Sequence, residues 1–290
     1  MRIPALLTVC AVFLLSACQT PRPVVPDPVG SAVEPVLPAD IGRLPAHPVW
    51  LIGEQHDAPE HQAMQDAVVR FLTGRHRLAA LVIEMAEAGQ STAGLSADAG
   101  EAQVRQVLGW TDERNDAGWP WDRYGPTILS AVRAGVPVLG GNLPRDRQRQ
   151  AMADDSLDRL LDAASLARQQ ALVREGHCML LPDRQIAPMT RIQLARDRSM
   201  AGVVLQAIRP GKTVLLIAGN EHVRRDLGVP RHLPADVPIL VLQSRGRDAA
   251  ATGVSSAGAG GAHGLADLTW LTPPLPPRDY CAELRQQMKR

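Results

Sequence analysis

The feature that most constrains this chain of 290 residues is a set of short apolar runs, each bounded by turn residues. The runs are residues 49–52, 78–83, 136–139, 213–218 and 238–242. They are continuously apolar rather than alternating, which is typical of strands covered on both faces of a parallel sheet. Stretches with helical spacing separate them, at residues 58–75, 126–134, 154–174 and 192–208. The alternation predicts an α/β fold with a mostly parallel central sheet flanked by helices, and a helical insertion around residues 145–208.

Composition and missing motifs exclude several classes of function. Lys plus Arg number 31 against 30 Asp plus Glu, and no segment concentrates the arginines, so a nucleic-acid partner is not expected. The chain lacks a phosphate-binding Gly-Lys-Ser loop, a Rossmann glycine fingerprint, a Gly-x-Ser-x-Gly elbow and a His-Glu-x-x-His helix. It also lacks Cys-x-x-Cys-His, the usual site of covalent haem attachment. Nucleotide chemistry and serine hydrolysis are therefore not expected.

The N-terminus has the pattern of a secretory signal. A basic start is followed by an apolar run over residues 3–15 that is too short to span a bilayer comfortably. The sequence Leu15-Ser16-Ala17-Cys18 resembles a bacterial lipobox, which predicts that residues 1–17 are cleaved and that Cys18 carries lipid. The alternative is an ordinary signal peptide with an incidental cysteine. Because Gln19 replaces the Asp of an inner-membrane retention signal, we expect a lipid anchor at the periplasmic face of the outer membrane.

Two further segments have a biased composition. Residues 18–47 are rich in proline and read as an extended tether between the lipid and the domain. Residues 48–290 then form the α/β domain, within which residues 249–264 contain mainly Ala, Gly and Ser and are expected to form a flexible surface loop.

Polar motifs follow four of the apolar runs. They are Gly53-Glu54-Gln55-His56-Asp57, Glu84-Met85, Gly140-Gly141-Asn142 and Gly219-Asn220-Glu221-His222. A single His or Glu at a strand end is more often a helix cap or a solvated loop residue. Four such motifs at one edge of a sheet favour a shared crevice, because ligands of open α/β sheets bind outside the carboxyl ends of the strands. Imidazoles and carboxylates there can ligate a divalent metal or supply a general base and its partner.

An ordered series of motifs gives the chain a resemblance to a known family. The series is Gly53–Asp57, Ile83-Glu84-Met85, Trp121–Tyr124, Gly141–Arg145, His177-Cys178, Gln193–Asp197 with Met200-Ala201, and Ala218–Val223. It resembles the ChaN-like haem-binding uptake proteins of the Tiki, TraB and erythromycin-esterase superfamily. The resemblance implies that His56, Glu84 and His222 line the superfamily's crevice, where hydrolytic members act. It also implies haem binding at the outer membrane during iron acquisition.

The resemblance does not assign the iron ligand, so candidates come from side-chain chemistry. Haem iron accepts phenolate or imidazole axial ligands, which makes Tyr124, His177 and Tyr280 the candidates. The alternative for Tyr124 is a core position beside the neighbouring tryptophans, and for His177 a helix-end histidine. Further predicted contacts of the porphyrin and its propionates are Met179, Arg184, Asn142 and Asn220.

Two cysteines remain for the folded domain in an oxidising compartment. Cys178 and Cys281 are predicted to form a disulfide, which would bring Tyr280 close to His177. The alternative is a pair of unpaired, buried thiols.

Three functions are compatible with these residues. The first is a lipid-anchored envelope protein that binds haem or a related iron compound, with an outer-membrane receptor and a second copy of the chain as further partners. The alternative is a metal-dependent hydrolase that uses Glu54, His56, Glu84 and His222, in which His56, Glu84 and His222 hold Mn, Co or Zn. The third is a structural lipoprotein with a vestigial crevice.

Overall fold

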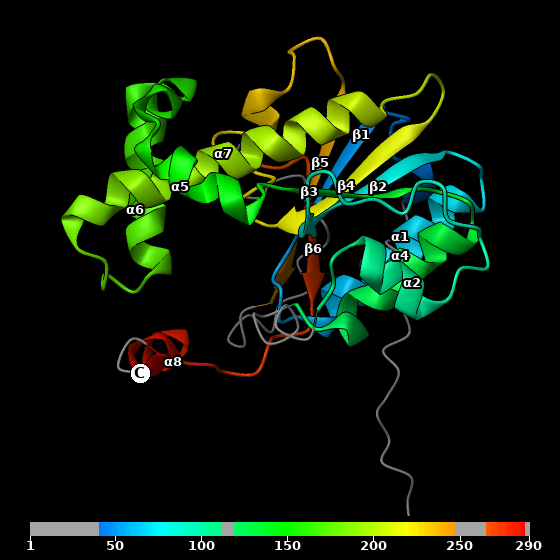
Figure 1. Ribbon diagram of the computed structural model, residues 1–290, viewed down its shortest axis with the longest axis horizontal. Helices are drawn as coiled ribbons and strands as arrows, with labels where there is room; N and C mark the ends of the chain where they lie inside the picture. Colours follow the sequence, from blue (N-terminus) through cyan, green and yellow to red (C-terminus); the bar gives the residue numbers. More distant parts are fainter. Residues whose placement is uncertain (1–40, 112–118, 248–264, 288–290) are drawn as a thin grey trace, which may run out of the picture. The chain divides into compact units, whose positions relative to one another are not determined.

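The computed structural model describes residues 41–111, 119–247 and 265–287. Six strands form one sheet in the order β3-β2-β4-β1-β5-β6, and every paired strand is parallel to its neighbour (Figure 1). The strands are β1 Val49–Glu54, β2 Leu78–Glu87, β3 Val138–Asn142, β4 Thr213–Gly219, β5 Ile239–Gly246 and β6 Leu268–Thr272. The predicted parallel sheet is confirmed. β6 was not predicted, because an edge strand that is covered only in part does not require a continuous apolar run.

Helices connect the strands as predicted, with different boundaries. They are α1 Pro59–Thr73, α2 Glu101–Val107, α4 Trp121–Arg133, α5 Arg145–Ala153, α6 Ala163–Gly176, α7 Asp183–Ala207 and α8 Tyr280–Gln287, with 3-10 helices η1 Ile41–Arg43, η2 Asp155–Leu160 and η3 Val229–His232. The helical insertion lies between β3 and β4 and comprises α5, η2, α6 and α7. The helix predicted over 154–174 is divided in two, because Asp162 accepts a hydrogen bond from the backbone of Ser165 and caps α6.

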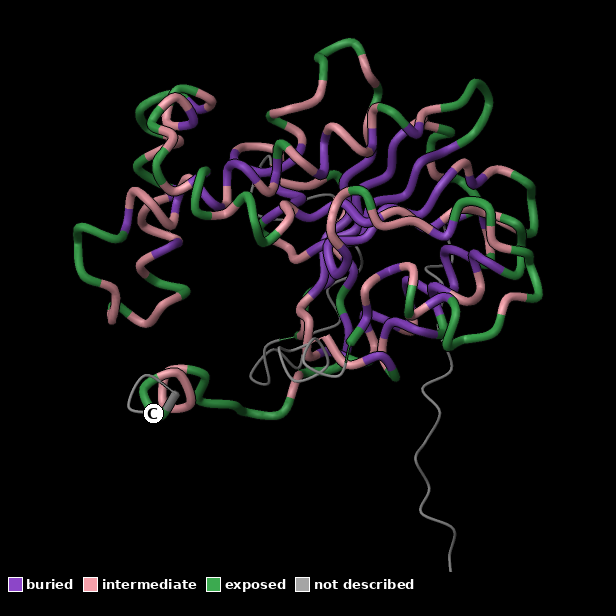
Figure 2. Tube along the Cα trace, in the orientation of Figure 1, coloured by how far each residue is buried: buried purple, intermediate pink, exposed green. Residues whose placement is uncertain are grey.

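The sheet is covered on both faces. Trp50 and Ile52 point to the side covered by α1, α2 and α4, whereas Val49 and Leu51 point to the side covered by α7. This alternation follows from the two-residue repeat of a strand. Figure 2 shows the central strands as buried along almost their whole length, which agrees with the apolar runs in the sequence.

The start of α1 has no side-chain cap. Ala58 is the N-cap residue, and the Asp57 before it does not cap the helix. Pro59 occupies the first turn, where its missing N–H costs little. The Asp57 carboxylate is therefore available for other contacts.

Several predicted segments lie outside the described residues. These are the signal peptide 1–17, the lipidated Cys18, most of the tether 18–47 and the loop 249–264. Ile41 is described and is 5% exposed within the core, so packing already begins before residue 48. None of the helices in the described ranges combines the length and the apolarity needed to cross a bilayer.

Candidate functional site

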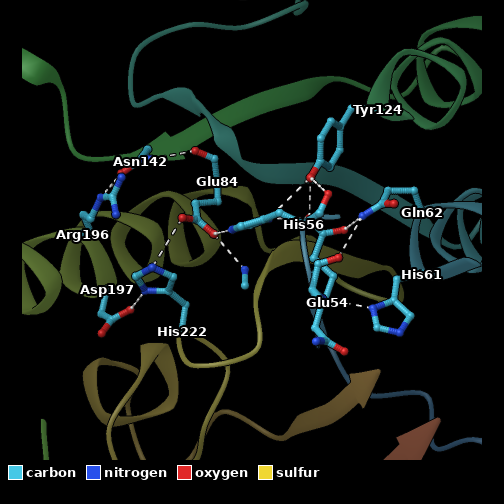
Figure 3. A network of polar contacts seen from close by, with 12 residues as sticks. Glu54, His56, His61, Gln62, Glu84, Tyr124, Asn142, Arg196, Asp197 and His222 are labelled. Atoms are coloured by element: carbon cyan, nitrogen blue, oxygen red, sulfur yellow. Dashed lines mark hydrogen bonds and ion pairs between the residues drawn. The ribbon is translucent and has the colours of Figure 1, made fainter. Parts of the chain in front are cut away.

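The carboxyl ends of the central strands meet around a crevice. Glu54 ends β1 opposite Gly219 of β4, and Glu84 lies in β2 directly after the last residue that pairs with β4. A cavity of about 840 Å³ opens there. The side chains that line it include Glu54, His56, Glu84, Trp119, Arg196, Asn220, His222 and Arg245. The structure thus brings together the four residues Glu54, His56, Glu84 and His222 that the sequence placed at strand ends (Figure 3).

Glu54 is the most heavily hydrogen-bonded group of the site. Its Oε1 accepts bonds from the Tyr124 hydroxyl and from Nδ1 of His56, both at 2.7 Å. Its Oε2 accepts bonds from the side-chain amides of Gln62 at 2.8 Å and Gln65 at 2.6 Å. Only 2% of Glu54 is exposed, so these four donors replace the water that an ionised carboxylate requires.

His56 is oriented by Glu54 and faces the crevice. With Nδ1 bonded to Glu54, its Nε2 lies 3.8 Å from Oε2 of Glu84, and 36% of its side chain is exposed. Burial opposes the charged imidazole, but the hydrogen bond to Glu54 and the charge of Glu84 outweigh it and raise the pKa of His56. A Cβ at Gly219 would lie 3.3 Å from this Nε2, so the glycine keeps the space in front of the imidazole open.

Glu84 lies between two histidines. Its Oε1 is 3.4 Å from Nε2 of His222, and its Oε2 accepts a bond of 2.8 Å from the backbone N–H of Gly219. Burial disfavours the Glu84 carboxylate, but the charge of His222 outweighs this effect and holds the pKa of Glu84 well below its usual range.

His222 is held by a second carboxylate, that of Asp197 on α7. Nδ1 of His222 is 2.6 Å from Oδ1 of Asp197. Burial alone would lower the pKa of His222, but Glu84 and Asp197 together raise it to about 10. His222 is therefore an imidazolium at neutral pH. The crevice thus contains two carboxylate–histidine pairs that face each other across Glu84.

The predicted metal site gains no support from this geometry. Across the described part of the chain, no group of three or more His, Cys, Asp or Glu residues is arranged to hold a metal ion. The imidazoles of His56 and His222 point to Glu84 as ion-pair partners, and their Nδ1 atoms bond Glu54 and Asp197. The side chains that could ligate a metal therefore form hydrogen bonds and ion pairs with one another instead.

The two predicted asparagines occupy different positions. Asn142 donates from Nδ2 to the backbone carbonyl of Glu84 at 2.8 Å and accepts from Nε of Arg196 at 3.0 Å, so it supports the crevice from behind. Asn220 lines the crevice and donates to the carbonyl of Ser244 at 2.8 Å.

Three residues that complete the site were not among the predicted ones. Gln62 and Gln65 lie on α1 and bond Glu54, and Asp197 orients His222. The glutamines are three residues apart and buried together with the apolar residues of α1, a signal that could have identified them. Asp197 belongs to the recognised motif Gln193–Asp197, but its contact with His222 could not be predicted because the two residues are distant in the sequence.

Tyr124 is not placed to bind haem iron. It is 2% exposed, and its hydroxyl donates to Glu54. Burial and the charge of Glu54 raise its pKa far above that of a free phenol, so the phenolate that would bind iron is disfavoured. The alternative reading of Tyr124 as a core residue therefore describes its position.

The other candidate ligands gather around the predicted disulfide, which is confirmed. Cys178 and Cys281 are bonded, with Cα atoms 5.5 Å apart. His177 precedes one cysteine and Tyr280 precedes the other, and their Cα atoms are at most about 13 Å apart because successive Cα atoms are about 3.8 Å apart. We call the residues His177, Met179, Arg184 and Tyr280 around this bridge the disulfide surface.

The disulfide surface is open and partly apolar. Met179 is 69% exposed and Tyr280 is 48% exposed, and both belong to the few exposed large apolar side chains of the described residues. Arg184 is exposed in the first turn of α7. Arg191, by contrast, is bound to Asp158 through two hydrogen bonds of 2.7 and 3.0 Å and is not available to a ligand.

The fold and the crevice define an α/β protein with a polar site at the carboxyl ends of a parallel sheet. A family described as "Haem-binding uptake, Tiki superfamily, ChaN" matches residues 41–233, well over half of the chain. The chain therefore belongs to this family, as its motifs predicted. A search of curated proteins found no match.

Solved structures give the same fold. The chain is similar to the ChaN protein of Campylobacter jejuni, a structure described as cofacial haem binding, with 19% identity and a TM-score of 0.57 over 77% of this chain and 87% of that one. It also matches the type III effector HopBA1 (15% identity, 79% and 88% of the two chains, TM-score 0.41) and an erythromycin esterase in its open conformation (16%, 69% and 70%, TM-score 0.41). At 19% identity, the likeness to the Campylobacter jejuni protein shows the fold alone.

Proposed function

We propose that this protein binds haem or a related iron compound at the disulfide surface, as a lipid-anchored protein of the cell envelope that serves iron acquisition. Membership of the haem-binding uptake family supports the ligand class. The observation that carries the site is that the bridge sets an exposed phenol and an imidazole on its two sides.

The donor set fits haem. Nδ1 of His177 lies 2.7 Å from the carbonyl of Val173, and when it donates there its Nε2 is left free for a metal. Tyr280 is exposed, and the Asp57 carboxylate that accepts from its hydroxyl would take up the phenol proton when the oxygen binds iron. Met179 offers apolar surface to the porphyrin, and Arg184 offers a cation to a propionate. When bound, haem would supply an iron centre. His177 and Tyr280 would hold the iron, and Met179 and Arg184 would contact the porphyrin and a propionate.

Hemin titration of the full chain tests this proposal, with one tyrosine serving as the control for the other. We expect a Soret band that shifts or collapses in Tyr280→Phe or His177→Ala and remains in Tyr124→Phe. A Soret band lost only in Tyr124→Phe, or unchanged in all three variants, would contradict the proposed site.

The proposed localisation rests on the N-terminal sequence, and the proposed partners rest on the resemblance and the open surface. We expect the lipid on Cys18 to hold the protein at the periplasmic face of the outer membrane, near an outer-membrane receptor. A second copy of the chain is the partner expected over the exposed face of the haem. Membrane fractionation of a Cys18→Ser variant and sedimentation with and without hemin test these two expectations.

A second candidate function, hydrolysis in the crevice, is favoured by the Glu54–His56 pair. The carboxylate fixes the imidazole, whose Nε2 faces the open space above Gly219. This is the arrangement of a general base when the imidazole is neutral, and the raised pKa of His56 shifts that state to higher pH. We expect hydrolysis of an ester or peptide panel to be lost in His56→Ala. Assays with a chelator and with added Mn, Co or Zn separate metal-dependent hydrolysis from acid–base hydrolysis. No turnover of the panel under any of these conditions would count against this candidate.

A further inference from the structure

The C-terminal segment, residues 273–287, is attached to the rest of the chain at few points. None of residues 280–286 is buried, and Figure 2 shows the stretch that leads to α8 as exposed. An isolated helix of eight residues is not stable in water, and α8 has no buried face that would compensate. Its position therefore depends on the side-chain contacts that hold it.

Two attachments hold Tyr280 and its neighbours in place. The disulfide ties Cys281 to Cys178 at the end of α6. On the other side, the Tyr280 hydroxyl donates to the Asp57 carboxylate, and the Arg278 guanidinium lies 3.6 Å from the same group. The second attachment consists of exposed polar contacts, which contribute little to stability. The covalent bridge is therefore the dominant attachment.

The turn that carries Cys178 is in an unfavourable backbone conformation. Cys178 has φ 55° and Met179 has φ 59°, both in the left-handed region. A residue with a Cβ is disfavoured in that region, because its Cβ lies too close to the following carbonyl oxygen. Backbone bonds from Cys178 to Glu175 and from Met179 to Arg174, both 2.9 Å, close the turn. It presents Met179 to solvent beside the bridge.

The bridge is accessible to a small reductant. Both cysteines are half-buried, and the surface formed by residues 277–281 is open beside Cys281. Thiol–disulfide exchange requires that an attacking thiolate reach a sulfur atom, and exposed disulfides are the ones that regulation uses.

We propose that the Cys178–Cys281 disulfide is a redox latch that holds the disulfide surface in its ligand-binding arrangement; this role rests on the proposed function. A dithiol reductant opens the latch. Its first thiolate attacks one sulfur to form a mixed disulfide, and its second thiol displaces the protein. Two electrons and two protons pass to Cys178 and Cys281, which become thiols, while the reductant becomes a disulfide.

Opening the latch separates the two sides of the surface. The Tyr280 end of the segment then depends on the exposed polar contacts with Asp57, and the strained turn after His177 is free to relax. Because the bridge no longer preorganises the two donors, hemin affinity falls by at least about tenfold. The crevice keeps its geometry, since none of the hydrogen bonds of Glu54 or His222 involves residues 273–287.

The experiment has two arms on the full chain. In the first, hydrogen exchange of residues 177–180 and 273–287 is compared before and after dithiothreitol, with the Cys178→Ser/Cys281→Ser variant as a control on which the reductant has no effect. In the second, hemin is titrated into the oxidised protein, the double variant and the single variant Cys281→Ser, because dithiothreitol itself reacts with hemin. Circular dichroism verifies the fold of each variant, and the single variant replaces the double one if the latter does not fold.

The expected result is faster exchange in both segments on reduction and weaker hemin binding by both variants. Unchanged exchange would overturn the latch itself. Faster exchange with equal hemin affinity would overturn its control of the ligand and leave the proposed function intact. If oxidised protein binds no hemin, the proposed function fails and the regulation fails with it, while the exchange arm still reports whether the bridge holds the segment.

Discussion

The crevice and the disulfide surface are built in opposite ways. In the crevice, Glu54 alone accepts four hydrogen bonds, and its partners come from the turn after β1, from α1 and from α4. At the disulfide surface, Met179 and Tyr280 are exposed and one covalent bond joins the two sides. Geometry that many buried contacts determine is rigid and costly to disturb. Geometry that one exposed bond determines can be switched without unfolding the protein.

Removal of the buried Glu54 carboxylate should cause the greatest loss of stability. Glu54→Ala leaves the donors of Tyr124, Gln62 and Gln65 without their acceptor in the core, so we expect a loss of about 3–5 kcal/mol in the free energy of unfolding. Urea denaturation measures it. The matched control is Glu101→Ala, which removes an exposed pair with Arg105 and costs under about 1 kcal/mol. Equal losses in the two variants would contradict the claim that the crevice is the rigid region.

The second effect is a pH dependence that arises from His222. Its pKa rises from 6.5 unfolded to about 10 in the folded protein, so the native state binds the proton more tightly. The stabilisation is complete below pH 6.5 and is lost as the pH rises towards 10, on the order of a few kcal/mol. Denaturation of wild type and His222→Asn between pH 6 and 10 measures it. The two stabilities should converge with rising pH, and parallel curves would show that His222 is neutral.

The third effect is the contribution of the Cys178–Cys281 disulfide to stability. Cys178 and Cys281 are 103 residues apart in the sequence. For a bridge that closes a loop of that length, the chain-entropy model gives a stabilisation of about 4–5 kcal/mol. Because the segment it ties down buries little, we expect Cys178→Ser/Cys281→Ser to lose only about 1–3 kcal/mol. Thermal unfolding with and without reductant measures this. A loss as large as that of Glu54→Ala would mean that the bridge supports the core.

The smallest effect concerns Tyr280. Tyr280→Phe removes only an exposed hydroxyl that bonds Asp57, so stability should change by under about 0.5 kcal/mol. Tyr124→Phe removes a buried hydroxyl and should cost about 1–2 kcal/mol. Calorimetry of the two variants ranks them. The reverse order would show that the C-terminal segment is more firmly packed than its exposure indicates.

Much of the fold could be predicted because a strand that is buried on both faces of a sheet requires a continuous run of apolar residues in the sequence. The apolar runs identified five of the six strands, and the parallel arrangement then placed Glu54, Glu84 and His222 near one edge. The even pair of cysteines predicted the bridge, and the ordered motifs predicted the family.

Tertiary structure alone decided which of these residues are free to act. Tyr124 and Tyr280 are the same residue type in the sequence. In the structure, Tyr124 is buried against Glu54, whereas Tyr280 is exposed beside a disulfide. The partnership of Asp197 with His222, and the pairing of both imidazoles with Glu84, depend on elements distant in the chain. The physical reason is that solvent access and charge pairing are properties of neighbours in space. Local sequence determines apolar pattern and strand identity, whereas packing determines which donors remain available to a ligand.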